Sequence, residues 1–282
     1  MSGPDELARW IGRREVRTDV LRARDLAAWN AMLDRDDPFP GDGDPVPPGF
    51  HWTLFPPIAR QSELGRDGHP RRGGFLPPVD LPQRMWAGSR IRFGAPLRVG
   101  QRVEQSSVVE RIEEKSGRAG ALVFVTVRHA VTAPAGIAVD EEQDLVYREP
   151  QKGAALEAPA QPAPSSPWHR AIAPDDVLLF RYSALTFNGH RIHYDRKYAT
   201  VEEGYPGLVV HGPLLATLLL DLLRRHLPAA APERFSFKAL RPTFDVSPFS
   251  VEGEPDADGR RVRLWSTDNR GAVSVEAEAF LR

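Results

Sequence analysis

The chain repeats one order of sequence patterns on either side of a segment rich in proline, alanine and serine, at residues 149–168. A segment of that composition without apolar periodicity is typical of a linker. Each flanking part begins with a helical pattern, passes through a loop with a Pro-Gly step, and ends in alternating strand patterns. We therefore divide the chain into a half at residues 1–148, the linker, and a half at residues 169–282, and we expect the halves to share one fold.

Helices are predicted at the start and in the middle of each half. The patterns at residues 18–29 and 173–184, in which an aspartate precedes an apolar run, predict two short opening helices. A longer helix follows in the second half, because leucines recur at helical spacing over residues 214–223 and Pro228 provides a stop. The matching helix in the first half should be shorter, because two adjacent prolines interrupt the segment.

Alternating strand patterns close both halves. Turns at residues 115–120 and 268–271 join the long strands, which predicts antiparallel hairpins. A long apolar helix beside a larger antiparallel sheet is an α+β architecture, and two such units can pair their sheets edge to edge into one continuous sheet. The predicted strands are residues 89–93, 103–112 and 121–131 in the first half and residues 235–244, 262–267 and 272–281 in the second.

The composition excludes several classes of function. The 37 basic and 38 acidic residues leave a net charge of −1, which offers no electrostatic attraction for nucleic acid or an anionic membrane. The chain has no cysteine, which excludes thiolate nucleophiles, iron–sulfur clusters and cysteine zinc sites. The longest apolar run is too short to span a bilayer, and the N-terminus has no signal or transit pattern. We expect a cytoplasmic protein that acts on small metabolites and binds neither nucleic acid nor membrane.

Side chains suited to acid–base chemistry gather in the first part of the second half. Asn188, His190 and His193 stand within six residues of one another. About twenty residues further on, a Gly-Pro step at residues 212–213 opens the apolar helix, whose free N–H groups could receive a developing oxyanion. These two segments together form the candidate active site.

Residues 187–194 read Phe-Asn-Gly-His-Arg-Ile-His-Tyr and resemble the form Phe-Asn-x-His-x-Ile-His-Tyr of one branch of the MaoC-type hydratases and dehydratases. That branch contains the type 2 3-hydroxyacyl-thioester dehydratases and the mesaconyl-C4-CoA and itaconyl-CoA hydratases. Residues 207–213 are similar to the segment at the start of the family's central helix. The wider family has the form Asp-x-Asn-Pro-Leu-His, so Asn188 stands in place of its aspartate and His193 in place of its histidine.

The resemblance covers nearly the whole chain and implies a tandem, or double, hotdog fold, in which two antiparallel sheets, each wrapped on a helix, join into one. It implies a hydratase, reversible as a dehydratase, that adds water to a 2-enoyl-CoA thioester, with mesaconyl-C4-CoA or itaconyl-CoA to citramalyl-CoA favoured. The coenzyme A thioester is the substrate, and no cofactor is expected. Three alternatives remain: a 3-hydroxyacyl-thioester dehydratase of fatty-acid metabolism, a non-catalytic acyl-CoA-binding module, and a thioesterase. The sheet edges of a double hotdog favour a homodimer.

Hydration of an enoyl thioester requires a base for the water, a proton at Cα and stabilisation of an enolate oxygen. His193 is the expected general base, because an imidazole titrates near neutrality. Asn188 cannot titrate and should orient the water through its carbonyl or its amide. The N–H of Gly212 is expected to bind the thioester oxygen at the helix N-terminus. Residues expected to contact the substrate or coenzyme A are Tyr182, His190, Arg191, Tyr194, Val210 and His211.

Several of these residues also have plainer interpretations. His190 and His193 could be a metal pair, but the sequence shows no third and fourth ligand nearby, so no metal is expected. His190 and His211 could instead brace the fold through hydrogen bonds. Asp195 could either orient His193 or cap a following turn.

The first half has no counterpart of the Asn-x-His-x-x-His set. Pro56 and Pro57 interrupt its helix, which should leave a gap through which the acyl group enters towards the second half. Its Arg90, Arg92 and Arg98 could be ordinary charges on strand faces. We therefore expect one active site per chain.

Overall fold

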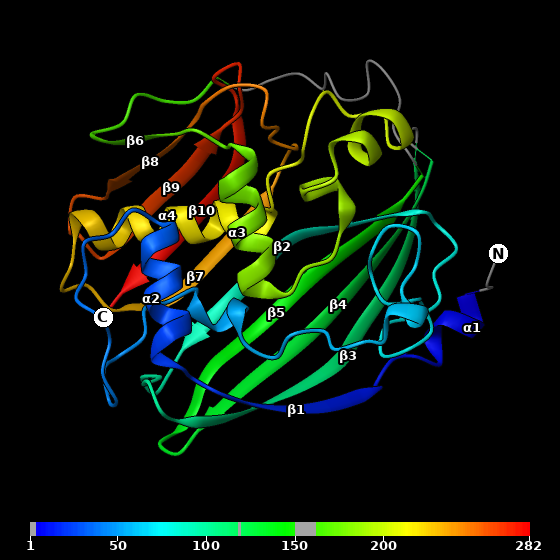
Figure 1. Ribbon diagram of the computed structural model, residues 1–282, viewed down its shortest axis with the longest axis horizontal. Helices are drawn as coiled ribbons and strands as arrows, with labels where there is room; N and C mark the ends of the chain where they lie inside the picture. The colour runs from blue at the N-terminus through cyan, green and yellow to red at the C-terminus, as the bar shows by residue number, and fades with distance from the viewer. Residues whose placement is uncertain (1–3, 118–119, 150–161) are drawn as a thin grey trace.

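The computed structural model describes residues 4–117, 120–149 and 162–282 of the chain (Figure 1). Within these ranges, ten strands form one antiparallel sheet in the order β1-β3-β4-β5-β2-β7-β10-β9-β8-β6. The elements of the first half are α1 (Pro4–Ala8), β1 (Arg14–Val20), α2 (Ala23–Met32), η1 (Phe50–Thr53), η2 (Gln61–Glu63), β2 (Gln83–Phe93), β3 (Arg102–Gly117), β4 (Gly120–Ala133) and β5 (Gly136–Arg148). Those of the second half are β6 (Trp168–Ile172), α3 (Asp176–Thr186), η4 (Arg191–His193), η5 (Tyr198–Glu202), α4 (Gly212–His226), β7 (Pro232–Ala239), β8 (Phe249–Pro255), β9 (Arg261–Thr267) and β10 (Val273–Leu281).

Strands β2 and β7 join the two halves. They pair antiparallel, with Ser89 opposite Phe237 and Ile91 opposite Phe235. The result is one continuous sheet with β1 and β6 at its edges, which confirms the predicted α+β architecture. The two predicted hairpins are confirmed as well, because β3 pairs with β4 and β9 pairs with β10.

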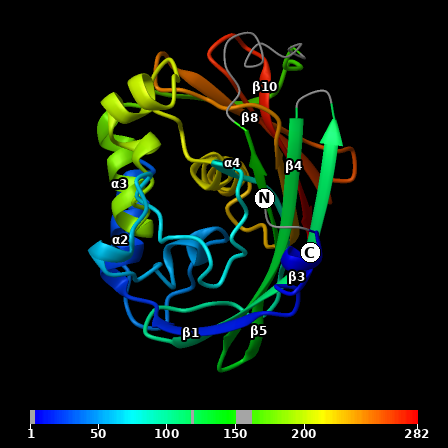
Figure 2. The same cartoon turned by 90° about the vertical axis from the view of Figure 1, so that its right-hand side faces the viewer.

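Helix α4 forms the centre of the core. Residues 214–223 are all buried, and Figure 2 shows α4 between the concave side of the sheet and the layer formed by α2 and α3. A helix that is apolar on all sides is stable only when it is covered on all sides. Asp221 is its buried charged residue. Its carboxylate accepts hydrogen bonds from Arg35, Arg170 and Arg225, so the buried charge is compensated.

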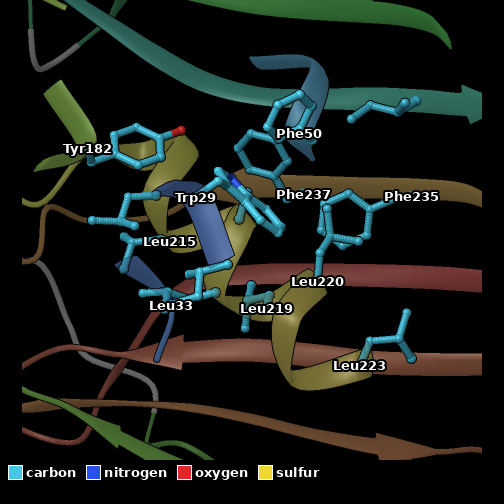
Figure 3. Packing of buried hydrophobic residues seen from close by; sticks show 14 of the residues in the cluster. Trp29, Leu33, Phe50, Tyr182, Leu215, Leu219, Leu220, Leu223, Phe235 and Phe237 are labelled. Atoms are coloured by element: carbon cyan, nitrogen blue, oxygen red, sulfur yellow. The ribbon is translucent and has the colours of Figure 1, made fainter. Parts of the chain in front are cut away.

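The first half has only the short helix η1 at the position of α4, which confirms the predicted asymmetry. Its Pro-Gly corner turns at Gly49, whose φ of 91° is favourable only for glycine. Phe50 follows, fully buried, and packs edge-on against Trp29 of α2 with ring centroids 6.0 Å apart. Figure 3 shows both rings in one cluster with Leu220 of α4. Helix α4 therefore supplies core for both halves.

Some predicted boundaries are wrong. The opening helix predicted at residues 18–29 is strand up to Val20, because residues 14–20 pair with β3, and α2 begins only at Ala23. The strand predicted at residues 235–244 ends at Ala239, shortly before a proline that cannot donate to the sheet. Strands β1, β5, β6 and β8 have no counterpart among the predicted elements.

Most of the predicted linker, residues 150–161, lies outside the described residues. After it, Pro162 makes an isolated bridge with Ala272, and Trp168 is already the first residue of β6. The sheet of the second half therefore begins within the range assigned to the linker. In the described ranges, no helix combines the length and apolar character needed to cross a membrane.

Candidate active site

His193 ends the short helix η4 in the segment 187–195, which we name the Asn188 loop. Its side chain is buried, with 8% of the residue exposed. The Nδ1 atom lies 2.7 Å from the carbonyl oxygen of Val209. Because a carbonyl can only accept a hydrogen bond, the proton of the neutral ring is on Nδ1 and Nε2 has the free lone pair.

Burial lowers the pKa of His193 to about 4. The hydrogen bond to Val209 acts in the opposite direction, and the charge of His69 adds to the lowering. Near pH 7 the ring is therefore neutral, and its Nε2 can accept a proton. This is the protonation state that a general base needs.

His211 packs face to face on His193. The ring centroids lie 3.7 Å apart with an angle of 19° between the planes. The Nε2 of His211 shares a hydrogen bond of 2.8 Å with the Ser183 hydroxyl of α3. Burial, followed by the charge of His193, places the pKa of His211 well below its ordinary value. His211 is thus a neutral ring that fixes the plane of His193 from behind.

Asn188 follows the end of α3, where Phe187 adopts the left-handed conformation with a φ of 51°. The N–H of Asn188 donates to the carbonyl oxygen of Ser183 at 2.8 Å. Its side-chain Oδ1 accepts a hydrogen bond of 3.0 Å from the N–H of His190. The carbonyl of the amide therefore braces the loop, which leaves the NH₂ group as the donor toward the cavity.

Asn188, His193 and Gly212 line one cavity of about 310 Å³, which we name the His193 cavity. Gly212 is the first residue of α4, and Pro213 follows it. Among the described residues, none accepts a hydrogen bond from the Gly212 N–H. A free N–H at a helix start attracts negative charge, and the helix dipole adds to that attraction. The structure thus brings the three predicted catalytic residues to one cavity.

Arg191 and Tyr194, two of the predicted substrate contacts, form hydrogen bonds within the Asn188 loop. Arg191 donates to the Asp195 carboxylate from Nε at 3.0 Å and from a terminal nitrogen at 2.7 Å. The Tyr194 hydroxyl donates to the carbonyl oxygen of Gly189 at 3.0 Å. Asp195 also accepts from the N–H of Tyr198 at 3.0 Å, so it braces the turn that leads into η5 and does not orient His193. Neither Arg191 nor Tyr194 lines the His193 cavity.

The other predicted contacts lie closer to the cavity. His190 and Val210 line the His193 cavity. Tyr182 of α3 is buried, and burial raises the pKa of its hydroxyl. It lines a neighbouring cavity of about 410 Å³, which we name the Glu141 cavity. His211 lies behind this wall and lines neither cavity.

A segment of the first half packs against the Asn188 loop. We name residues 64–82 the first-half loop. A Cβ on Gly68 would overlap the carbonyl oxygen of Gly189, so only glycine permits this approach of the two backbones. The carbonyl oxygen of Asp67 accepts a hydrogen bond of 2.9 Å from the N–H of Arg191. The two halves therefore build the site together.

This packing brings in residues that the sequence patterns miss. The ring of His69 lies 4.2 Å from that of His190, and the Asp67 carboxylate is 3.0 Å from Nδ1 of His69. Burial and the charge of Arg84 lower the pKa of His69, although Asp67 opposes them. The sequence offers no periodic signal for these residues, because they lie in a loop or at the unpredicted start of β2.

Three cavities share their walls. A third cavity of about 490 Å³, which we name the Arg148 cavity, lies beside the His193 cavity and shares His190, Ile192 and Val209 with it. The His193 and Glu141 cavities share Asn188 and Pro213. The Arg148 cavity is rich in arginine, and the arginines that line it are Arg66, Arg71, Arg72, Arg84 and Arg148. Space for an acyl thioester thus continues from a basic region past His193 into the first half.

Asp67, His69 and His190 are also close enough to be considered as metal ligands, with their ligand atoms within 4.8 Å of one another. The grouping differs from the His190–His193 pair considered from the sequence. The Asp67 carboxylate already binds His69. The positive charge of Arg84 acts on both histidines, which disfavours a second cation there.

Comparisons with known proteins agree with the motif. A family model described as hydroxyacyl-thioester dehydratase type 2 matches residues 49–245. A protein of Chloroflexus aurantiacus named mesaconyl-C(4)-CoA hydratase is 48% identical over 283 residues, which cover 99% of each chain.

Solved structures show the same fold. A MaoC-like dehydratase from Phytophthora capsici superposes with a TM-score of 0.73 at 15% identity, over 99% of this chain and 98% of that one. A Mycobacterium tuberculosis protein described as having a double hotdog fold superposes with a TM-score of 0.58 at 15% identity, over 96% of both chains. The fold is therefore the double hotdog. Because the family model spans more than half of the chain and the Chloroflexus protein matches it almost throughout, the chain belongs to the hydroxyacyl-thioester dehydratase type 2 family.

Proposed function

We propose that the protein adds water reversibly across the double bond of a 2-enoyl-CoA thioester, with mesaconyl-C4-CoA to citramalyl-CoA as the favoured reaction and itaconyl-CoA as the second candidate. One observation carries the proposal. A neutral histidine with a free Nε2, a carboxamide and an unpaired helix N–H line the same cavity. The name of the 48% identical relative supports mesaconyl-C4-CoA over a straight-chain enoyl group.

In the proposed first step, Nε2 of His193 takes a proton from a water molecule while the water oxygen forms a bond to Cβ. The π electrons of the double bond move to the thioester, which becomes an enolate. The NH₂ group of Asn188 positions the water by donating to its oxygen. The Gly212 N–H donates to the enolate oxygen, where negative charge develops.

In the second step, His193 returns the proton to Cα, and the enolate collapses to the hydroxyacyl thioester. One imidazole serves both steps because Val209 holds its Nδ1–H and His211 holds its plane. The reverse sequence is a dehydration. No step consumes a cofactor, and we expect activity to persist after treatment with a metal chelator.

A 3-hydroxyacyl-thioester dehydratase of fatty-acid metabolism is the alternative, and the description of the matching family model favours it. Loss of the enoyl-thioester absorbance, followed in parallel with release of free thiol, tests the proposal directly. We expect the absorbance to fall without thiol release. Thiol release would indicate a thioesterase, and no change in either signal would indicate a binding module. A higher kcat/KM for straight-chain substrates on acyl carrier protein than for mesaconyl-C4-CoA would favour the alternative.

We also propose that the protein forms a homodimer and is located in the cytoplasm. Strands β1 and β6 leave the sheet with two edges, which supports association into a homodimer. Light scattering coupled to size exclusion would measure the mass. A cytoplasmic location is to be tested by cell fractionation.

A further inference from the structure

Arg84 faces the cavities because of an irregularity in β2. The pairing of β2 with β5 shifts by one residue between Trp86 and Gly88. An extra residue of this kind reverses the face on which the following side chains lie. Arg84 and Trp86 line the cavities, whereas Arg90, an even number of residues further on, lies on the outer face and pairs with two acidic residues of β5.

Arg84 is unpaired at the junction of the site. It lines the His193, Glu141 and Arg148 cavities. Among the described residues, its guanidinium has neither a hydrogen-bond nor an ion-pair partner. Arg241, the other arginine that lines the His193 cavity, forms an ion pair with Asp268 at 3.3 Å. Arg66 likewise forms an ion pair with Glu202. A guanidinium in such a cavity provides donors and charge for a ligand.

The surroundings of Arg84 favour an anion. Burial, and next the charge of Arg84, lower the pKa of His69. The pKa of His190 is also low, chiefly through burial, and Arg84 is among the charges that contribute. Near pH 7 both rings are neutral. The single N–H of His69 points to the Asp67 carboxylate, so His190 is the ring whose N–H remains for a ligand. Asp67, whose charge interacts with that of Arg84, is hydrogen-bonded to His69, and in the described part of the chain no acid forms an ion pair with Arg84.

We propose that Arg84, with the His69 and His190 rings beside it, forms a carboxylate-binding subsite that selects acyl thioesters carrying a free carboxylate next to the reacting double bond. The proposal rests on the proposed function and names the residue that sets its substrate class. In mesaconyl-C4-CoA, the free carboxylate is attached to Cβ, the carbon that water attacks. The planar fork of a guanidinium matches the two oxygens of such a group.

The position of Arg84 also affects the attack of water on Cβ. A carboxylate on Cβ repels the water oxygen as that oxygen loses its proton to His193. An ion pair with Arg84 removes much of this repulsion where the charges are close and screened from water. The phosphates of coenzyme A are kept away from the thioester by the long pantetheine arm. A cation that lines the same cavity as His193 therefore meets the acyl group and not those phosphates.

Binding of two unreactive thioesters tests the subsite independently of hydration. Succinyl-CoA and butyryl-CoA have the same chain length, contain no double bond, and differ in the terminal carboxylate. We expect calorimetry to show that the wild-type protein binds succinyl-CoA more tightly. The preference should be about 10- to 100-fold in Kd, as expected for a charge-assisted contact. Arg84→Met should remove it by weakening succinyl-CoA binding, and the Kd for butyryl-CoA should stay within about threefold of the wild-type value.

Arg90→Met is the matched control, because it removes an arginine from the outer face of the same strand. It should keep the preference for succinyl-CoA. Thermal unfolding of both variants checks that the fold is retained, and Arg84→Lys provides a variant that keeps the charge without the fork. Equal affinity of the wild-type protein for the two thioesters would overturn the proposal. Equal weakening of both by Arg84→Met would overturn it as well, since Arg84 would then serve coenzyme A or the fold.

Kinetics separate failure of the subsite from failure of the proposed function. With mesaconyl-C4-CoA, Arg84→Met should lower kcat/KM by about 10- to 100-fold, whereas the rate with crotonyl-CoA, which lacks the carboxylate, should change much less. A preference for succinyl-CoA together with no hydration of any enoyl thioester would refute the hydratase and retain the subsite. If Arg84→Met impairs hydration of both substrates equally, the subsite is refuted and the hydratase is retained.

Discussion

Each half buries a histidine shortly after its Pro-Gly corner, but the two histidines have different partners. In the first half, Nε2 of His51 lies 3.2 Å from the Glu141 carboxylate. In the second half, His211 bonds to the Ser183 hydroxyl and stacks on His193, whose Nδ1 bonds to a backbone carbonyl. In the described part of the chain, neither of these two rings has an acidic hydrogen-bond partner.

Burial has different consequences for His51 and His193: the first is bound to a charged carboxylate, and the second stays neutral with a free nitrogen. Burial acts to raise the pKa of Glu141, but the hydrogen bond and charge of His51, with contributions from His129 and Ser89, outweigh it and hold that pKa below its usual value. The carboxylate is therefore charged and His51 is committed to it. His193 has no counter-charge, so burial keeps it neutral. Of these two histidines, His193 is therefore the one that remains available as a base.

The largest expected effect follows from removal of the base in the second half. His193→Ala should lower kcat/KM for hydration by about 10²–10⁴, the usual contribution of a general base. The fold should be retained, because the side chain makes one hydrogen bond, to Val209. Circular dichroism checks the fold, and steady-state kinetics measure the effect. A loss of less than about threefold, below about 1 kcal/mol, would show that another group is the base.

In the first half, removal of the buried His51 side chain should lower the free energy of unfolding. His51→Ala leaves the buried Glu141 carboxylate without its imidazole, which should cost up to about 3–5 kcal/mol of unfolding free energy. Ser89 and Trp52 still donate to that carboxylate and will reduce the loss. Urea denaturation measures it, with the exposed His169→Ala as the control. Equal effects of the two variants would mean that Glu141 does not depend on His51.

Substitutions at Asn188 test the role of its carboxamide, and Asn188→Asp also gives the second half a carboxylate near its base. Asn188→Ala should cost less than loss of the base, about 10² in kcat/KM. Asn188→Asp keeps an acceptor for the His190 N–H and loses the NH₂ donor. We expect it to be active, with an additional acidic limb in its pH profile from the new carboxyl group. An inactive Asp variant with a partly active Ala variant would show that negative charge beside the acyl group is rejected.

The smallest expected effect is the pH dependence of stability. The pKa of His193 is about 4 in the folded chain and 6.5 when unperturbed. The stabilisation from keeping it neutral is complete above pH 6.5 and is lost as the pH falls toward 4, since only the unfolded chain takes up the proton in that range. Between pH 6.5 and 5, the wild type should lose about 2 kcal/mol more than His193→Gln. Identical losses by urea denaturation would mean that His193 is not buried as described.

Local patterns were sufficient where neighbours in the sequence carry the information. The leucine period predicts α4, and the turn residues predict the hairpins, because each depends on side chains a few residues apart. The paired prolines at residues 56–57 correctly predicted the short first-half helix. Asn188, His193 and Gly212 could be proposed together because two short motifs of the second half contain them, and the structure places all three at one cavity.

What the patterns missed depends on contacts between distant segments. Strand β1 was mistaken for part of a helix, because its partner β3 lies far along the chain. His69 reaches His190 only through the close approach of Gly68 to Gly189. Arg84 reaches the cavities only through the register shift in β2, which no alternation of side chains reveals. The chemistry of the base is thus encoded locally, whereas the walls that surround the substrate arise from packing between the halves, because backbone approach and strand register are properties of the folded chain.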